Sequence, residues 1–288
     1  MRGESMDALI VNAAITGMVP LKTDNPNVPL TPEEIVADVR RCRDAGATIV
    51  HLHAREADGS ATYKKAIYAE IFQGVREECP ELLLSGSCSG RVYGEFWQRS
   101  EVLELQPDFG SLTLGSLNFP KQPSINSPEM IQKLALAMKN RGIVPELEIF
   151  DVGMADYAHY LIQKQILGPP YYANLLLGSL GTLAASPENL CTLIRALPPG
   201  TTWSVAGIGR FQFAMNSLAV VMGGHVRVGL EDAIYEDWET KRLATNAGLI
   251  DRVVRLARAA GRRIATPEET RQLIGLAPAE SLPLRRAA

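Results

Sequence analysis

Two histidines stand two positions apart in the segment TIVHLHA (48–54). Residues two apart in an extended strand point to the same face, so His51 and His53 direct their imidazoles to one side. Two converging imidazoles can bind a divalent metal, usually zinc, although buried histidines that are simply hydrogen-bonded show the same spacing. The chain has four histidines in all, and these two stand together at a predicted strand end. We therefore take this pair as the first candidate for chemistry.

A third metal ligand can come from the segment HVRVGLED (225–232). Glu231 and Asp232 are adjacent acids at its end, so one side chain can face a metal while the other faces a substrate. Two histidines and a glutamate leave one coordination position open, as catalytic zinc sites do, and other divalent transition metals accept the same ligands. The alternative is that the two acids cap the helix that follows.

Further polar side chains stand near the ends of other predicted strands. Arg227 shares a strand face with Glu231, and a buried arginine needs a partner such as Asp232, Glu148 or a substrate carboxylate. Glu146 alternates with Glu148 in PELEIF, so both face the interior, and Glu148 is the better site candidate because it lies nearer the strand's carboxyl end. Hydroxyl groups suited to anchoring a carboxylate, or to simple packing, are those of Ser87, Ser89, Ser111 and Thr113.

The elements that must position these residues follow a regular order. Short apolar runs alternate with longer amphipathic stretches, which predicts repeated strand–helix units and a (β/α)₈ barrel forming one domain over residues 1–288. Such a barrel places chemistry at the carboxyl ends of its strands. Four helix starts carry Ser or Thr before Pro and Glu, at Thr31, Ser127, Ser186 and Thr266. The expected strands are 8–16, 48–54, 82–88, 109–115, 143–150, 171–178, 201–207 and 225–231.

Other segments receive structural predictions. The Pro-rich loop 17–30 follows the first strand, so it is a candidate substrate wall or lid, with a plain surface connection as the alternative. His225 begins its strand and is predicted to be structural at the far end of the barrel. His159 is predicted to be a partly exposed helix residue, and residues 276–288 are predicted to form a flexible tail.

Composition excludes several classes of function. A net charge of −3 argues against nucleic acid or an anionic membrane as the main partner. No apolar run is long enough to span a bilayer, and the beginning MRGESMD lacks the apolar core of a signal peptide. The four cysteines are scattered without a CxxC pair, which favours a reducing cytoplasm over a disulfide framework.

Several motifs together resemble one known family, the β-keto acid cleavage enzymes. They are VNAAITG, AGATIVHLHAREADG, PELEIFDVGM, WSVAGIGR and GGHVRVGLEDAIY, and the resemblance runs from about Ala8 to Gly275. It implies a zinc-dependent (β/α)₈ barrel, usually a homotetramer, in which a β-keto acid and acetyl-CoA give acetoacetate and the CoA thioester of the remaining acyl group. Metal acting as a Lewis acid would favour loss of the C2 proton before the Claisen and retro-Claisen steps.

The resemblance also implies roles for individual residues. His51, His53 and Glu231 resemble the zinc ligands, and Arg227 with Asp232 resembles the proton-transfer pair. Glu148 resembles the buried acid near the arginine. The residues that resemble the cradle of the substrate carboxylate are Ser87, Gly90, Ser111 and Thr113.

One position departs from the best-known member, which acts on 3-keto-5-aminohexanoate. That enzyme has an acid two residues after Thr-Gly, where this chain has Val19. An ammonium group buried beside Val19 without a carboxylate would be unfavourable by several kcal/mol. We therefore expect a neutral or apolar β-keto acid to be preferred. The alternative that fits the sequence next best is a metal-dependent aldolase or lyase. A zinc hydrolase and a non-catalytic binding barrel fit it less well.

Overall fold

Eight parallel strands close into a barrel in this computed structural model, which describes residues 8–120 and 122–278. The predicted barrel is therefore confirmed, with all eight strands inside the expected segments. The beginning MRGESMD and residues 279–288 of the predicted tail lie outside the described residues. The barrel strands are β1 (Val11–Ala14), β2 (Ile49–Leu52), β5 (Leu83–Gly86), β6 (Phe109–Thr113), β9 (Val144–Ile149), β10 (Tyr172–Leu177), β11 (Thr202–Gly207) and β12 (His225–Val228).

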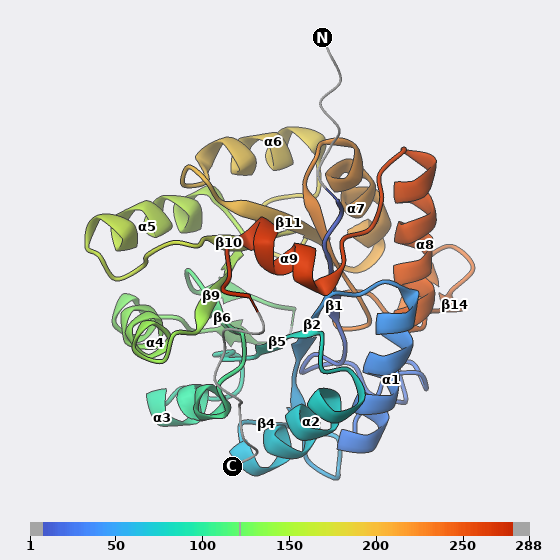
Figure 1. Cartoon of the computed structure of the whole chain (residues 1–288), viewed down its shortest axis with the longest axis horizontal. Coiled ribbons are helices and arrows are strands. Elements are labelled where there is room, and N and C mark those ends of the chain that lie inside the picture. Colours follow the sequence, from blue (N-terminus) through green and yellow to red (C-terminus); the bar gives the residue numbers. More distant parts are fainter. Residues whose placement is uncertain (1–7, 121, 279–288) are drawn as a thin grey trace.

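Helices surround this barrel, as Figure 1 shows. They alternate with the strands along the chain, because each apolar helix face packs on the strands that flank it in sequence. The helices of the described residues are α1 (Pro32–Ala45), α2 (Lys65–Glu78), α3 (Phe96–Ser100), α4 (Pro128–Asn140), α5 (Val152–Gln163), α6 (Pro187–Ala196), α7 (Gln212–Val221), α8 (Asn246–Ala259) and α9 (Pro267–Ile274), with short 3₁₀ turns η1 (Glu101–Leu105) and η2 (Gly209–Phe211).

The four predicted helix starts are confirmed. Thr31, Ser127, Ser186 and Thr266 each accept a hydrogen bond from a backbone N–H in the first turn of the helix that follows. Thr31 and Thr266 also form complete capping boxes with the glutamate three residues on. Each cap satisfies N–H groups that would otherwise lack a partner and so sets where its helix begins.

Helix α9 closes the end of the barrel at which the strands begin (Figure 1). Its Ile274 packs in a cluster with Ile10, Ile49, Phe109 and Tyr172, which lie just before or at the beginnings of barrel strands. His225 lies at the same end, is buried, and accepts a hydrogen bond from the Ile10 backbone N–H. Chemistry is therefore restricted to the opposite end, and the structural prediction for His225 is confirmed.

The opposite end carries three small hairpins in the loops after barrel strands. These hairpins are β3 (Ala54–Arg55) with β4 (Ala61–Thr62), β7 (Leu117–Asn118) with β8 (Pro123–Ser124), and β13 (Tyr235–Asp237) with β14 (Arg242–Leu243). They follow β2, β6 and β12, so they border the face where a barrel places its active site. Among the described helices, none is both long and apolar enough to cross a bilayer.

Candidate active site

His51 and His53 lie at the carboxyl end of β2 and are both buried. Their Nε2 atoms are 3.2 Å apart, and Glu231, which follows β12, brings Oε1 to 3.2 Å from His53 Nε2. One donor atom from each of the three residues lies within 4.8 Å of the others. In the closed barrel, β2 and β12 are the two neighbours of β1. The ends of these two strands therefore lie close together, and their candidate ligands meet.

The donor set fits a divalent metal. Glu231 Oε2 is buried with no hydrogen-bond partner in the described chain and lies 3.8 Å from His51 Nε2. A carboxylate oxygen that is buried without a hydrogen-bond partner is unfavourable unless a cation neutralises it. Two imidazole nitrogens and a carboxylate that converge in this way match the ligand chemistry of zinc and related transition metals.

Glu146 lies behind this cluster, on β9, and is fully buried. Its Oε2 is 2.8 Å from His51 Nδ1, and the Ser85 hydroxyl donates to the same oxygen. Asn12 and Asn174 donate to Oε1 at 2.6 and 2.7 Å. Burial alone would raise the pKa of Glu146, but His51, Arg227 and the Ser85 hydroxyl hold it at about 2. With Nδ1 bonded to this carboxylate, Nε2 of His51 is the nitrogen left to bind a metal.

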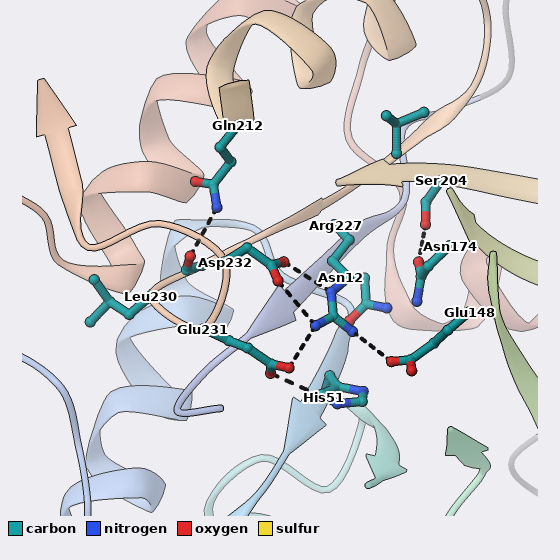
Figure 2. Close-up of polar contacts among 12 residues, drawn as sticks. Asn12, His51, Glu148, Asn174, Ser204, Gln212, Arg227, Leu230, Glu231 and Asp232 are labelled. Atoms are coloured by element: carbon teal, nitrogen blue, oxygen red, sulfur yellow. Dashed lines mark hydrogen bonds and ion pairs between the residues drawn. The ribbon is translucent and has the colours of Figure 1, made fainter. Parts of the chain in front are cut away.

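Arg227 stands beside the cluster and is surrounded by three acids (Figure 2). Its Nε is 3.0 Å from Asp232 Oδ2, and its Nη2 is 2.8 Å from Glu231 Oε1. Its Nη1 is 3.4 Å from Glu148 Oε1, while the Thr113 hydroxyl donates to the other Glu148 oxygen at 2.6 Å. Asp232 and Glu148, the two predicted partners of Arg227, therefore both contact it.

One guanidinium cannot neutralise three carboxylates, and the pKa values of Asp232 and Glu231 shift in opposite directions. Burial raises the pKa of Asp232 and, with Glu231 close by, outweighs the stabilising Arg227. Burial also acts on Glu231, but Arg227 and the two histidines lower its pKa well below the usual range. The alternative that these two acids cap a helix is wrong, because the next helix, α8, begins after its own cap, Thr245.

A cavity of about 1100 Å³ opens above these groups. Among the predicted substrate-binding residues, Val19, Ser87 and Thr113 line it. Ser111 does not line it; its hydroxyl accepts a hydrogen bond from the Cys88 backbone N–H at 2.9 Å. Gly90 does not line the cavity either. It packs against Arg99 so closely that an added Cβ would lie 2.6 Å from Arg99 Nη1. Ser111 and Gly90 thus shape the loop that presents Ser87.

Two buried arginines, whose roles the sequence did not indicate, hold the walls of the cavity. Arg55 donates to the carbonyls of Gly17 and Pro20 at 2.8 and 3.0 Å. It therefore fixes the start of the Pro-rich loop as a wall of the cavity, since Met18, Val19 and Pro20 line it. Arg99 donates to the Cys88 carbonyl at 2.8 Å and to Asn126 Oδ1, joining the loops after β5 and β6.

His159 is not part of the site. It lies in α5, is partly exposed, and its Nε2 is 3.0 Å from the Ala196 carbonyl. Its predicted position on a helix is confirmed.

Comparisons with known proteins agree with this architecture. Residues 8–276 match the profile of a family described as "beta-keto acid cleavage enzyme". A "3-keto-5-aminohexanoate cleavage enzyme" from Fusobacterium nucleatum is 40% identical over 272 residues, covering 94% of this chain and 99% of that one. A "3-oxoadipate:acetyl-CoA acetyltransferase" from Cupriavidus necator is 36% identical over 270 residues, covering 93% and 94%.

Among solved structures, the protein ObcA without ligand has the same fold. It superimposes with a TM-score of 0.75 at 21% identity, over 87% of this chain and 66% of ObcA. At that identity the likeness concerns the barrel alone.

Proposed function

Because this chain belongs to the β-keto acid cleavage enzyme family, we propose that it transfers the acetyl group of acetyl-CoA onto a β-keto acid. The products are acetoacetate, built from the acetyl group and C1–C2 of the keto acid, and the CoA thioester of the remaining acyl group. Acetyl-CoA is named for the Cupriavidus necator relative, which supports its use here. The observation that carries the proposal is the meeting of His51, His53 and Glu231 with Arg227 and Asp232 below one large cavity.

We propose that His51, His53 and Glu231 hold a divalent metal, with zinc the first choice. Such a metal would act as a Lewis acid toward the keto acid and lower the barrier to losing its C2 proton. Glu146 would orient His51 through Nδ1, as carboxylates behind metal-bound histidines commonly do.

Asp232 is the base in this proposal. Arg227 contacts both of its oxygens, at 3.0 Å through Nε and 3.3 Å through Nη2, so the carboxylate is held in one orientation on the cavity wall. A positioned carboxylate can take the C2 proton, after which C2 attacks the acetyl carbonyl and CoA leaves as thiolate. The CoA thiolate then attacks the C3 carbonyl, the C2–C3 bond breaks, and the electron pair left on C2 regains the proton from Asp232, so that acetoacetate leaves. Glu148 and Thr113 support Arg227 from the other side.

The substrate chain is proposed to be neutral or apolar where it faces Val19. Val19 lies on the cavity wall and is half exposed. The acid that would pair with an ammonium group at this position is replaced by an isopropyl group, so we propose that 3-keto-5-aminohexanoate is a poor substrate. A homotetrameric assembly and a cytoplasmic location stay predictions.

The test is to incubate purified protein with acetyl-CoA and a panel of β-keto acids, with and without a chelator. Acetoacetate and the matching acyl-CoA should appear together, and the chelator should abolish both. Omitting acetyl-CoA is the control, because an aldolase or lyase would still cleave the keto acid. If no keto acid yields acetoacetate although the protein carries bound metal, the proposed function is wrong.

A further inference from the structure

Arg91 lies on the cavity wall and has no part in the mechanism above. It belongs to the loop after β5, where its backbone N–H donates to Ser89 Oγ at 3.3 Å and its carbonyl accepts from Gln122 Nε2 at 3.2 Å. Its guanidinium carbon lies 3.3 Å from the centre of the Phe119 ring. Both the backbone and the planar head group are therefore held in place before any ligand binds.

Within the part of the chain that the structure describes, the Arg91 guanidinium has no oxygen acceptor. Over residues 8–120 and 122–278, no carboxylate forms an ion pair with Arg91 and no oxygen accepts a hydrogen bond from its side chain. Other buried arginines are satisfied: Arg55 donates to three carbonyls and Arg227 contacts three acids. A partly buried cation without a counter-ion is unfavourable, and an anion entering the cavity would relieve this.

The cavity that Arg91 lines is also lined by Glu231, Glu148 and Asp232, the acids of the proposed reacting centre. Burial lowers the pKa of Arg91, and the acids that partly offset this are Glu231, Glu148 and Asp232. The phosphates of CoA are separated from its thioester by the long pantetheine arm, so an anion bound in the cavity that holds the reacting groups belongs more naturally to the keto acid. The N–H groups of a guanidinium form a planar fork, which matches the two oxygens of a carboxylate.

We propose that Arg91 binds a carboxylate of the β-keto acid and so determines how tightly the keto acid is held. The inference rests on the proposed function, because it assumes that the keto acid occupies this cavity. The carboxylate is either the one at C1, common to all β-keto acids, or a second one at the far end of a β-keto dicarboxylic acid. Both would form the same bidentate pair, and substrates that differ in the second carboxylate distinguish them.

The experiment compares the wild-type protein with Arg91→Gln and Arg91→Lys, using 3-oxoadipate and 3-oxohexanoate with acetyl-CoA. Arg91→Gln should raise KM for the keto acid by about tenfold to a hundredfold, as expected for losing a charge-assisted pair, while kcat and KM for acetyl-CoA change little. Arg91→Lys should recover only part of the loss, because an ammonium cannot form the planar pair. A rise for both keto acids identifies the C1 carboxylate, and a rise for 3-oxoadipate alone identifies the second one.

Arg252→Gln is the matched control. Arg252 also lies over a phenylalanine ring, 4.3 Å from the centre of Phe213, but it is not among the residues that line the cavity. Its replacement should leave KM for both keto acids unchanged. The inference is overturned if Arg91→Gln binds keto acids as the wild type does, or if only KM for acetyl-CoA rises, which would assign Arg91 to CoA.

A direct binding measurement separates the failure of this inference from the failure of the proposed function. Calorimetry with 3-oxoadipate and with 3-oxohexanoate, in the absence of acetyl-CoA, reports keto acid binding without turnover. If the wild type makes no acetoacetate but Arg91→Gln loses binding of either keto acid, the function is wrong and the carboxylate site stands. If the wild type is active and the variant binds both equally well, the carboxylate site is wrong and the function stands.

Discussion

Glu146 Oε2 lies 2.8 Å from His51 Nδ1, on the side of the ring away from the nitrogen that faces His53. The pair is buried beneath the candidate metal site, and two asparagines and Ser85 complete the hydrogen bonds of the carboxylate. An imidazole held in this way keeps its proton on Nδ1 and presents the Nε2 lone pair. Metal binding should therefore depend on a residue that would not touch the metal.

Replacing Glu146 by Gln tests this dependence. Glutamine keeps the size but removes the charge that fixes the His51 tautomer, so metal affinity should fall by about 10- to 100-fold. Metal titration against a competing chelator measures the change. Glu148→Gln is the matched control, since Glu148 lies on the same face of β9 but contacts Arg227 instead of a histidine. Equal metal affinity in the two variants would contradict the role given to Glu146.

Asp232→Asn tests the proposed base. The amide preserves shape and one contact to Arg227 but cannot take a proton, so kcat should fall by about 10²- to 10⁴-fold. Metal content and KM for acetyl-CoA should stay near the wild-type values, because Asp232 is not one of the three converging donors. Steady-state kinetics of acetoacetate formation provide the measurement. A kcat within a few-fold of the wild type would assign proton transfer to another group.

Much of this site follows from alternation along strands, and the rest depends on contacts between distant segments. The spacing of His51 and His53, and the run ending in Glu231, predict which side chains share a face. Alternation also turns Glu146 and Glu148 inward, but it does not say which of the two meets His51. That choice depends on the register of β9 against β6, where Glu146 pairs with Ser111 and Glu148 with Thr113.

Arg91 illustrates the same limit. Nothing in its local sequence indicates burial, because the ring that covers it, Phe119, belongs to the loop between β7 and β8 and lies 28 residues further along the chain. Glu231 and Asp232 could have been helix caps on sequence grounds alone. Only the position of α8, which begins at Asn246, removes that alternative.

Val19→Glu should open the cavity to a cationic substrate. A carboxylate on this wall would pair with an ammonium group, so kcat/KM for 3-keto-5-aminohexanoate should rise at least about tenfold relative to an uncharged analogue of equal length. Val19→Gln is the control, since it adds polarity and size without charge. Val19 is half exposed, so either change should leave folding intact. The Val19 hypothesis is wrong if the wild type already uses the amino substrate as well as the uncharged analogue.

Gly17→Ala should disturb Glu231 from the neighbouring strand end. Gly17 has a φ of 65°, and a Cβ there would lie 2.6 Å from Glu231 Cγ. We expect a stability loss of about 1 kcal/mol from the backbone conformation, together with weaker metal binding from the displaced carboxylate. Gly142→Ala separates the two effects, because Gly142 has a φ of 66° and no neighbour within 4 Å of an added Cβ. Thermal unfolding should shift in both variants, and metal affinity should fall in Gly17→Ala alone.

His225 should make the stability of the protein depend on pH below neutrality. Burial, followed by the nearby Arg262, lowers its pKa to about 3 in the folded chain. In the unfolded chain a histidine titrates near 6.5, so between about pH 6.5 and pH 3 the unfolded state binds the extra proton and folding loses stability as the pH falls. The loss should amount to a few kcal/mol across this window and be absent above pH 7.

His225→Gln removes this titration and keeps a group that can accept the hydrogen bond from the Ile10 backbone N–H. Unfolding by denaturant should be followed from pH 8 to pH 4 on protein freed of metal by a chelator, so that protonation of the metal ligands does not contribute. The stability of the wild type relative to the variant should stay constant above pH 7 and then decline steadily toward pH 4, because only the wild type gains a proton at this position on unfolding. A difference that stays constant over the whole range would mean that His225 takes up its proton equally well in the folded barrel.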